Sequence, residues 1–361
     1  MMLPMCVMPR CIRISGKPGI LKNLSRVFQK NMTNNTPEVM MWPALQAAQR
    51  QRGQTGKNPN VGAALWRHGR LVDVVATGDG GRPHAESQLN ILPGDVLAVT
   101  LEPCAHEGET PACARLVADA RPSKVYVGCL DPDPRTSGHG LEIMKEAGIS
   151  VQAGICEHKA RHVMAGFLTR MIHQRPHVRL KLAMTRDGRS ALADGRSQWI
   201  TGFEARQHGH LLRAEADAIM VGAATFIQDQ PTLTCRLGLS GRDPEIFVLS
   251  GREEISSLPK NVQILGTSGG QQDLSQILRQ LAQEGIGNLL VESGGRLAAS
   301  LLQAELVDEL YCYQSDLLLG ANARSALGAL KDQELLLPKG MIVKERRQLG
   351  QDQLTRYVVE R

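Results

Sequence analysis

Long apolar runs are missing from this chain of 361 residues, and no segment reaches the roughly 18 to 20 apolar residues that a membrane helix requires. We therefore expect no membrane partner. Aromatic residues are also scarce, at 3% of the chain, which leaves few side chains to stack on nucleic-acid bases. The contents of 42% apolar and 22% charged residues are instead typical of a globular protein with a full core, and the length suggests two domains.

Acidic residues are absent from positions 1–37, which carry six basic residues. The chain as a whole has 42 basic and 36 acidic residues, so the remainder is neutral. A broad basic surface is not indicated, and we expect no nucleic-acid partner. We interpret segment 1–37 as a wrong start, with translation beginning at Met32, or as a disordered extension. Because the segment is cationic, a targeting presequence is the third alternative.

Evenly placed cysteine pairs, which are typical of secreted disulfide frameworks, are missing as well. The eight cysteines lie at positions 6, 11, 104, 113, 129, 156, 235 and 312. Only Cys104 and Cys113 share a recognisable motif. We therefore expect a reducing compartment and a cytoplasmic protein.

Expected strands alternate with expected helices along the rest of the chain, which indicates an α/β fold in two domains, 38–174 and 175–361. In the first domain we expect helices at 41–53, 87–92, 111–120, 140–148 and 157–174, and strands at 61–67, 70–77, 95–101, 124–130 and 150–155. In the second we expect helices at 204–216, 273–285 and 295–305, and strands at 177–184, 217–225, 245–250, 288–293, 340–350 and 353–361. The strand at 217–225 is expected to run into a loop.

The sequence LEPCAHEGETPAC, at 101–113, contains two cysteines that we interpret as metal ligands. Twenty residues before Cys104, the sequence RPHAES supplies His84 and Glu86. One imidazole and two thiolates, with the fourth position open, form the donor set of a catalytic zinc site. Zinc lowers the pKa of its water toward about 7, and Glu86, at the start of an expected helix, would pass the proton to a leaving amine. The H-x-E…P-C pattern is typical of zinc-dependent base deaminases.

Simpler interpretations exist for each of these residues. Cys104 and Cys113 could be buried thiols, and Glu86 could be a solvated helix residue. His106, in the same loop, could be a fourth zinc ligand or a loop and substrate residue. We favour the loop role, because a fourth protein ligand would close the site.

Eight residues separate the two cysteines, whereas most base deaminases have C-x-x-C. In this respect the loop closely resembles the E-P-C-x-H-x-G-x-T-P-x-C loop of the bifunctional riboflavin biosynthesis family. That family fuses a diaminohydroxyphosphoribosylaminopyrimidine deaminase to a 5-amino-6-(5-phosphoribosylamino)uracil reductase. The sequences NPNVG, at 58–62, and DPDPRTSGHG, at 131–140, resemble two further family motifs. The resemblance implies a cytidine deaminase-like three-layer domain followed by a dihydrofolate reductase-like domain.

The second half carries motifs that resemble the family's NADPH-dependent reductase. These are LKLAMTRDGRSA, SQWITG, HLLRAEADAIMVGAAT, DQPTLTCR and LLVESGGRLAASLL. The resemblance assigns substrate contacts to Ser197, Arg213, Leu233, Arg236 and Glu292. It assigns NADPH contacts to Ala183, Trp199, Thr225, Asp229, Ser250, Gly294, Gly295, Arg296, Leu297, Ala298, Ala299 and Ser300. From the residues alone, backbone N–H groups at Gly294 and Gly295 suit a cofactor phosphate, and Arg213 and Arg236 could clamp a substrate phosphate. Taken singly, Trp199 could be a core residue, Arg213 a solvated charge and the two glycines an ordinary turn.

Three residues depart from the family pattern: Glu109 replaces the usual Arg, Asp133 the usual Asn, and Gln230 the second Asp of D-D-P. The first two make the deaminase loops more acidic, and an acidic pocket repels a phosphorylated substrate. We therefore expect weak substrate binding or an anchor for the phosphate elsewhere, with activity retained.

The sequence thus predicts a two-step enzyme with one Zn²⁺ per chain and NADPH. Its partner is a small phosphoribosyl pyrimidine, and we also expect a homo-oligomer. A nucleic-acid base deaminase with a binding module is a second hypothesis, disfavoured by the cysteine spacing and the neutral body. A third is that one half has lost catalysis and only binds or scaffolds; Gln230 leaves this open for the reductase.

Overall fold

The computed structural model describes residues 35–107, 111–197, 199–236, 243–250, 259, 261–266, 273–328 and 340–360. Most of the extension expected at 1–37, and the departure at Glu109, lie outside this part. Among the described helices, none combines the length and apolar character needed to cross a membrane.

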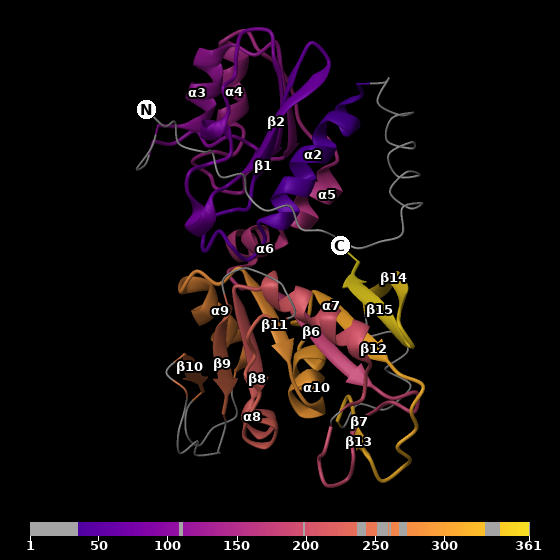
Figure 1. The fold of residues 1–361 in the computed structure, drawn as a ribbon. Helices are drawn as coiled ribbons and strands as arrows, with labels where there is room; N and C mark the ends of the chain where they lie inside the picture. The colour runs from indigo at the N-terminus through magenta and orange to yellow at the C-terminus, as the bar shows by residue number, and fades with distance from the viewer. Residues whose placement is uncertain are drawn as a thin grey trace, which may run out of the picture.

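The first half of the chain builds a five-stranded sheet in the order β2-β1-β3-β4-β5 (Figure 1). Its strands are β1 (Gly62–Arg67), β2 (Arg70–Ala76), β3 (Val96–Leu101), β4 (Lys124–Cys129) and β5 (Ser150–Gln152). The expected hairpin is confirmed, because β1 pairs antiparallel with β2. Strands β3, β4 and β5 are parallel, so their carboxyl ends share one edge.

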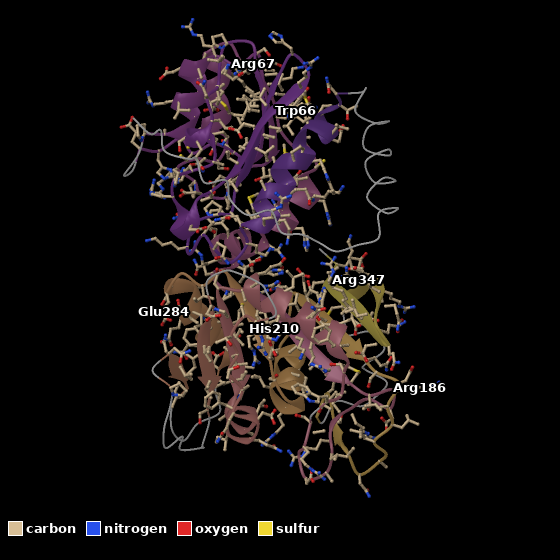
Figure 2. The ribbon with its side chains drawn as sticks, in the orientation of Figure 1. Trp66, Arg67, Arg186, His210, Glu284 and Arg347 are labelled. Carbon is tan, nitrogen blue, oxygen red and sulfur yellow. The ribbon has the colours of Figure 1, made fainter. Side chains whose placement is uncertain are left out.

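Helices cover both faces of this sheet, with α3 and α4 on one side and α2 and α5 on the other (Figure 1). They are α2 (Pro37–Arg50), α3 (Cys113–Ala120), α4 (His139–Glu146), α5 (Glu157–Val163) and α6 (Ala165–His173). Trp66 of β1, labelled in Figure 2, is 2% exposed and donates its indole N–H to the carbonyl of Met40 at 3.2 Å. This bond joins α2 to strand β1.

Three elements of the first half differ from expectation. Helix α2 begins at Pro37 rather than near 41 and keeps Pro43 inside it, because Thr36 caps the helix and its face of Met40, Met41, Ala44 and Leu45 is buried. The helix expected at 87–92 is only the 3₁₀ turn η2 (Glu86–Gln88), since Leu89 is already extended.

The single helix expected at 157–174 is two helices, α5 and α6, divided at Met164. The carbonyl of Val163, at the division, accepts from the side chains of Asn60 at 2.9 Å and Arg52 at 3.3 Å. These donors stabilise a helix end that the local sequence does not mark.

The second half builds an eight-stranded sheet in the order β10-β9-β8-β11-β6-β12-β15-β14 (Figure 1). Its strands are β6 (His177–Met184), β8 (Ala218–Gly222), β9 (Glu245–Leu249), β10 (Val262–Leu265), β11 (Asn288–Glu292), β12 (Glu309–Gln314), β14 (Met341–Leu349) and β15 (Asp352–Val359). A separate pair is formed by β7 (Arg189–Ala191) and β13 (Arg324–Ser325). The closing hairpin expected at the carboxyl end is confirmed by the antiparallel pair β14 and β15.

Alternate residues of the buried strands face two different cores, as the period of a strand requires. Leu289 and Val291 of β11 pack with α9 (Leu274–Gln283) and α10 (Gly295–Gln303), whereas Leu290 packs with α7 (Phe203–Ala214) and α8 (Ala223–Asp229). Helix α8 replaces the loop expected after β8. The eight-stranded sheet is therefore covered on both faces, and its strand ends are left to form a site.

Candidate active sites

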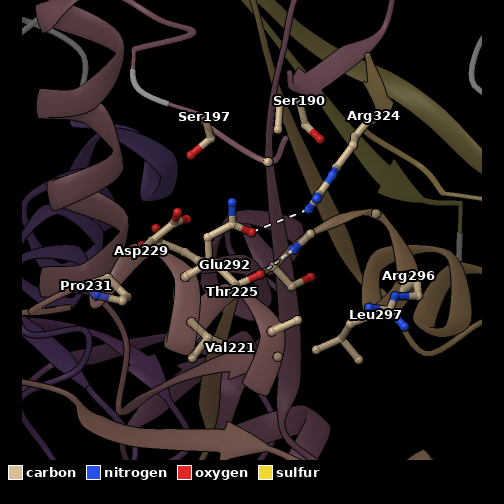
Figure 3. A pocket seen from close by; sticks show the side chains of 18 of the residues that line it. Ser190, Ser197, Val221, Thr225, Asp229, Pro231, Glu292, Arg296, Leu297 and Arg324 are labelled. Atoms are coloured by element: carbon tan, nitrogen blue, oxygen red, sulfur yellow. Dashed lines mark hydrogen bonds between the residues drawn. The ribbon is translucent and has the colours of Figure 1, made fainter. Parts of the chain in front are cut away.

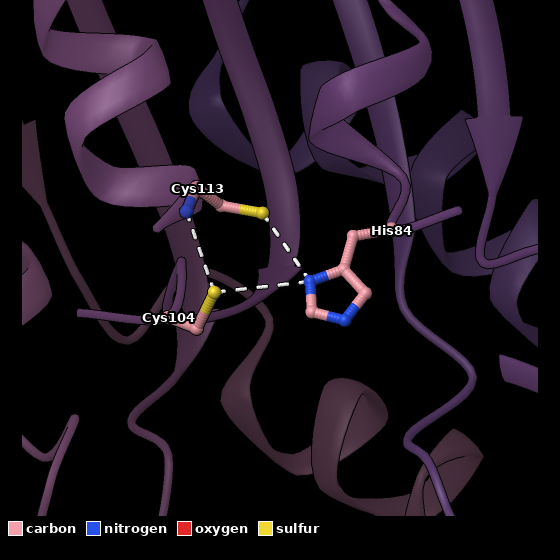
Figure 4. A group of neighbouring side chains, drawn as sticks. All are labelled: His84, Cys104 and Cys113. Atoms are coloured by element: carbon pink, nitrogen blue, oxygen red, sulfur yellow. Dashed lines mark hydrogen bonds between the residues drawn. The ribbon is translucent and has the colours of Figure 1, made fainter. Parts of the chain in front are cut away.

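His84, Cys104 and Cys113 converge at one edge of the first sheet (Figure 4). Cys104 follows β3, Cys113 begins α3, and His84 precedes η2. The Nδ1 atom of His84 lies 3.3 Å from Sγ of Cys113 and 3.7 Å from Sγ of Cys104. One ligand atom from each residue falls within 4.8 Å of the others, so the three could bind one metal ion.

Cys104 and Cys113 shift each other's pKa in opposite directions. Hydrogen bonding from the Cys113 thiol lowers the pKa of Cys104 to about 4, and the Cys113 backbone N–H also donates to Cys104 Sγ at 3.3 Å. The same contact raises the pKa of Cys113. Because zinc binds cysteine as the thiolate, a metal ion bound here would release the proton of Cys113.

Glu86 lies beside this cluster and is only 4% exposed. Burial raises the pKa of its carboxyl to about 7, although a hydrogen bond with Cys113 partly opposes the shift. A carboxyl with a pKa near neutrality can both take and return a proton. The 3₁₀ turn η2 places Glu86 beside His84, Cys104 and Cys113 without the helix expected at 87–92.

Glu102, in the same motif, is a buried residue whose role was missed from the sequence. Its carboxylate accepts four backbone N–H groups of the following loop, at 3.0–3.3 Å, from Asp131, Gly138, Gly140 and Leu141. Glu102 therefore fixes loop 131–141 against the strand that carries Cys104. The signal was present, because a Glu directly before Pro-Cys at a strand end is a buried charge that needs donors.

Asp133, one of the departures, carries its own counter-charge. Its carboxylate accepts from the Arg135 guanidinium at 2.5–3.1 Å, and this pairing holds the pKa of Asp133 below its usual value. His106 contacts Thr136 Oγ1 at 3.2 Å rather than joining the metal-ligand cluster. The expected acidity of this loop is thus partly offset by Arg135.

A cavity of about 670 Å³ opens at the strand ends of the second sheet (Figure 3). Eleven of the residues proposed from the sequence line it: Ala183, Ser197, Arg213, Thr225, Asp229, Leu233, Glu292, Gly294, Gly295, Arg296 and Leu297. They come from β6, α7, α8, β11 and α10 and from the segments beside them. Residues that lie far apart in the sequence are therefore brought together in one cavity.

A partly buried ion pair between Arg213 and Glu292 lines this cavity. Arg213 donates to Glu292 through Nε at 2.6 Å and Nη2 at 3.0 Å, and its Nη1 donates to the carbonyl of Thr234 at 3.2 Å. Lys181 Nζ lies 3.8 Å from the same carboxylate. The remaining N–H groups on Nη1 and Nη2 of Arg213 could donate hydrogen bonds to a ligand in the cavity.

Gly294 and Gly295 start helix α10 at the cavity wall. The N–H of Gly294 donates to Thr225 Oγ1 at 3.3 Å, which ties the helix start to α8. A Cβ on Gly295 would lie 2.7 Å from the carbonyl oxygen of Ser325 and 3.0 Å from Cα of Gly328. Glycine at 295 is therefore required by the close approach of segment 325–328, and the helix start faces the cavity as a phosphate site would.

Other residues proposed from the sequence lie outside the cavity lining. Trp199 is 66% exposed and stacks under the Arg206 guanidinium at 4.5 Å. Arg236 is exposed, and its backbone N–H donates to His210, which Figure 2 labels. The remaining ones are Ser250, Ala298, Ala299 and Ser300. Their assignment to ligands stays a prediction.

The lining also includes residues that were missed: Ser190, Gln228, Ser293, Arg324 and Gly328. Arg324 Nη1 lies 3.4 Å from Oε1 of Gln228 in the cavity (Figure 3). Arg324 is brought there by the pairing of β13 with β7, two short strands far apart in the sequence. The sequence around either strand contains no pattern that predicts this pairing.

Comparison with known proteins covers both halves of the chain. A family model described as the RibD C-terminal domain matches residues 176–354. The riboflavin biosynthesis protein RibD of Escherichia coli is 35% identical over 328 residues, which cover 80% of this chain and 89% of that protein. The structure of Acinetobacter baumannii RibD, form 1, has a TM-score of 0.81 at 33% identity and covers 90% of this chain and 99% of its own.

A solved structure from Thermotoga maritima gives the activities in its name, a diaminohydroxyphosphoribosylaminopyrimidine deaminase/5-amino-6-(5-phosphoribosylamino)uracil reductase. It has a TM-score of 0.79 at 30% identity and covers 90% of this chain and 99% of its own. The similarity along both halves confirms the expected fold class, a cytidine deaminase-like domain followed by a dihydrofolate reductase-like domain. The chain therefore belongs to the RibD family of bifunctional riboflavin biosynthesis enzymes, which join a deaminase to a reductase.

Proposed function

We propose that the first half deaminates 2,5-diamino-6-hydroxy-4-(5-phosphoribosylamino)pyrimidine and that the second half reduces the ribosyl chain of the product to ribityl. The proposed deamination is supported by the position of His84, Cys104 and Cys113 beside the buried carboxyl of Glu86. We propose that one Zn²⁺ is held by these three ligands. When bound, it would supply Lewis-acid activation of the attacking water.

Glu86 would move the protons of the deamination. It takes a proton from the water as the oxygen attacks the amine-bearing ring carbon, and it delivers a proton to the amine, which leaves as ammonia. Burial suits this role, because a carboxyl with a raised pKa exchanges protons near neutral pH. The order that Glu102 imposes on loop 131–141 would position the pyrimidine.

The second step uses the 670 Å³ cavity. NADPH would supply a hydride to C1′ of the ribose. We propose that the start of α10 receives a cofactor phosphate through the backbone N–H of Gly295, while the N–H of Gly294 donates to Thr225. Arg213, Glu292 and Lys181 would orient the phosphoribosyl substrate, with Arg213 donating through its free N–H groups.

We place the boundary between the catalytic domains at 174/175, giving domains 38–174 and 175–361. Support comes from the change of sheet between α6, which ends at His173, and β6, which begins at His177. We further propose a homo-oligomer in a reducing cytoplasm. The six cysteines of the described residues are all free, which fits that compartment.

The zinc assignment is tested with Cys113→Ala and the matched control Cys129→Ala, which removes another buried thiol from β4. Wild type and Cys129→Ala should hold about one zinc per chain and release ammonia from the diamino substrate without NADPH. Cys113→Ala should lose both properties and still reduce the deaminated substrate. Full zinc content in Cys113→Ala would overturn the ligand assignment.

A further inference from the structure

The carboxyl-terminal end of helix α7, which carries Arg213, lies directly against the deaminase domain. A Cβ on Gly53 would lie 2.8 Å from the carbonyl carbon of Glu215 and 2.9 Å from the carbonyl oxygen of Ala214. Gly53 also has a φ of +76°, so other residues would be strained there. Gln54 donates to the carbonyl of Ala214 at 3.3 Å. The backbones of the two domains therefore touch at the last turn of α7.

Glu215, which follows this last turn, is bound from both domains. Its Oε1 accepts from Gln49 Nε2 at 2.8 Å, and its Oε2 lies 3.5 Å from Arg52 Nη1. The reductase domain contributes Arg179 Nη1 at 3.0 Å from Oε2. Burial alone would raise the pKa of Glu215, but Arg52 and Arg179 outweigh it and lower the pKa. The carboxylate is charged and needs these partners.

Glu215 is only two residues after Arg213, which lines the reductase cavity. Arg179 is fully buried and donates to the carbonyl of Leu212 at 3.2 Å as well as to Glu215. Arg213 lies between these two points and makes its paired bonds to Glu292 at 2.6 and 3.0 Å. The placement of Glu215 therefore sets where the Arg213 side chain leaves the helix.

We propose that Gln49 and Arg52 of the deaminase domain are positioning residues for the reductase: by holding Glu215 at the end of α7, they hold Arg213 against Glu292 and the substrate. This inference rests on the proposed role of Arg213 in binding the phosphoribosyl substrate. It makes the affinity of the reductase for its substrate depend on a contact supplied by the other domain. The cofactor side of the cavity, at α10, has no such contact among the described residues.

Gln49→Glu tests this, because it sets a second carboxylate against Glu215 with almost no change in size. Gln46→Glu is the matched control, with the same change one turn earlier on an exposed position of α2. The full-length protein is assayed with the deaminated substrate and NADPH. Gln49→Glu should raise the KM for that substrate about threefold to tenfold over Gln46→Glu. The KM for NADPH and ammonia release from the diamino substrate should match the control. The melting temperature should fall, because the added carboxylate repels the partly buried carboxylate of Glu215.

Two outcomes would overturn the inference. One is an equal substrate KM in Gln49→Glu and Gln46→Glu. The other is a parallel rise in the KM values for the substrate and for NADPH, which would show that the whole reductase cavity is disturbed rather than Arg213 alone. Arg213→Ala separates this failure from that of the proposed function. If Arg213→Ala raises the substrate KM while Gln49→Glu does not, only the positioning role is lost; if Arg213→Ala has no effect, the role of Arg213 is wrong as well.

Discussion

Glu86 and Glu102 are two buried glutamates beside the same cysteines, and their surroundings give them different tasks. Glu102 accepts four backbone N–H groups, which fixes it as a structural anion. Glu86 is desolvated, with a pKa near 7, which suits proton transfer. The sequence separates them only in part, because H-x-E is a known chemical pattern, whereas the donors to Glu102 come from about 30 to 40 residues later in the chain.

Glu102→Gln should weaken the deaminase alone. The amide turns an acceptor into a donor that faces backbone N–H groups, so loop 131–141 loses part of its anchor. We expect about tenfold lower kcat/KM in ammonia release, with unchanged reduction of the deaminated substrate. Glu142→Gln, on the exposed face of α4, is the control and should behave as wild type. Ammonia release from Glu102→Gln at the control's rate would show that the loop does not need this anchor.

The bounds of helices and strands can be predicted where local sequence signals mark them. The prediction fails where contacts with distant residues decide the bounds. The hairpin β1–β2 and helices α3, α7, α9 and α10 lie where periodicity and turn residues predict them. The division at Met164 depends instead on Asn60 and Arg52, donors about 100 residues away. The same holds for the cavity, which β13 completes by pairing with β7. Contacts of this kind leave no trace in a local window of sequence.

Gly295→Ala should disturb the start of α10 and with it the cofactor. The added Cβ meets backbone atoms of segment 325–328, which cannot rotate away as a side chain could. If the overpacking of about 1–3 kcal/mol is expressed in cofactor binding, the Kd for NADPH rises about fivefold to 150-fold. Gly209→Ala is the matched control, because nothing lies within 4 Å of a Cβ there. Equal NADPH titrations by fluorescence for the two variants would contradict the close approach.

At the scale of the whole molecule, two catalytic domains share a charged interface. Besides the contacts of Glu215, His162 of the deaminase domain lies 3.8 Å from Glu309, which also binds His177 and Arg356. Next to it, Asp308 pairs with Arg175 at 2.6 and 2.8 Å. The neutral body predicted from the sequence thus contains dense local charge, which composition alone does not reveal.

Asp308→Asn should give a pH-dependent loss of stability. Burial would raise the pKa of Asp308, but Arg175 and His177 outweigh it, so the folded pKa lies below the unfolded value of about 3.9. The carboxylate therefore stabilises the fold above that pH, and this contribution is lost as pH falls through the folded pKa. Urea unfolding at pH 7 should show a loss of about 3 kcal/mol, shrinking as pH falls below about 4. Asp316→Asn, at an exposed position, should show none; a loss in Asp308→Asn that is independent of pH would contradict the linkage.

The central claim is that the two halves act in sequence on one substrate. The most direct test is NADPH consumption by the full-length chain supplied with the diamino phosphoribosyl pyrimidine, for wild type and Glu86→Gln. Wild type should consume NADPH, and Glu86→Gln should consume it only when the deaminated substrate is supplied instead. Consumption by Glu86→Gln at the wild-type rate from the diamino substrate, or none by wild type, would contradict the account.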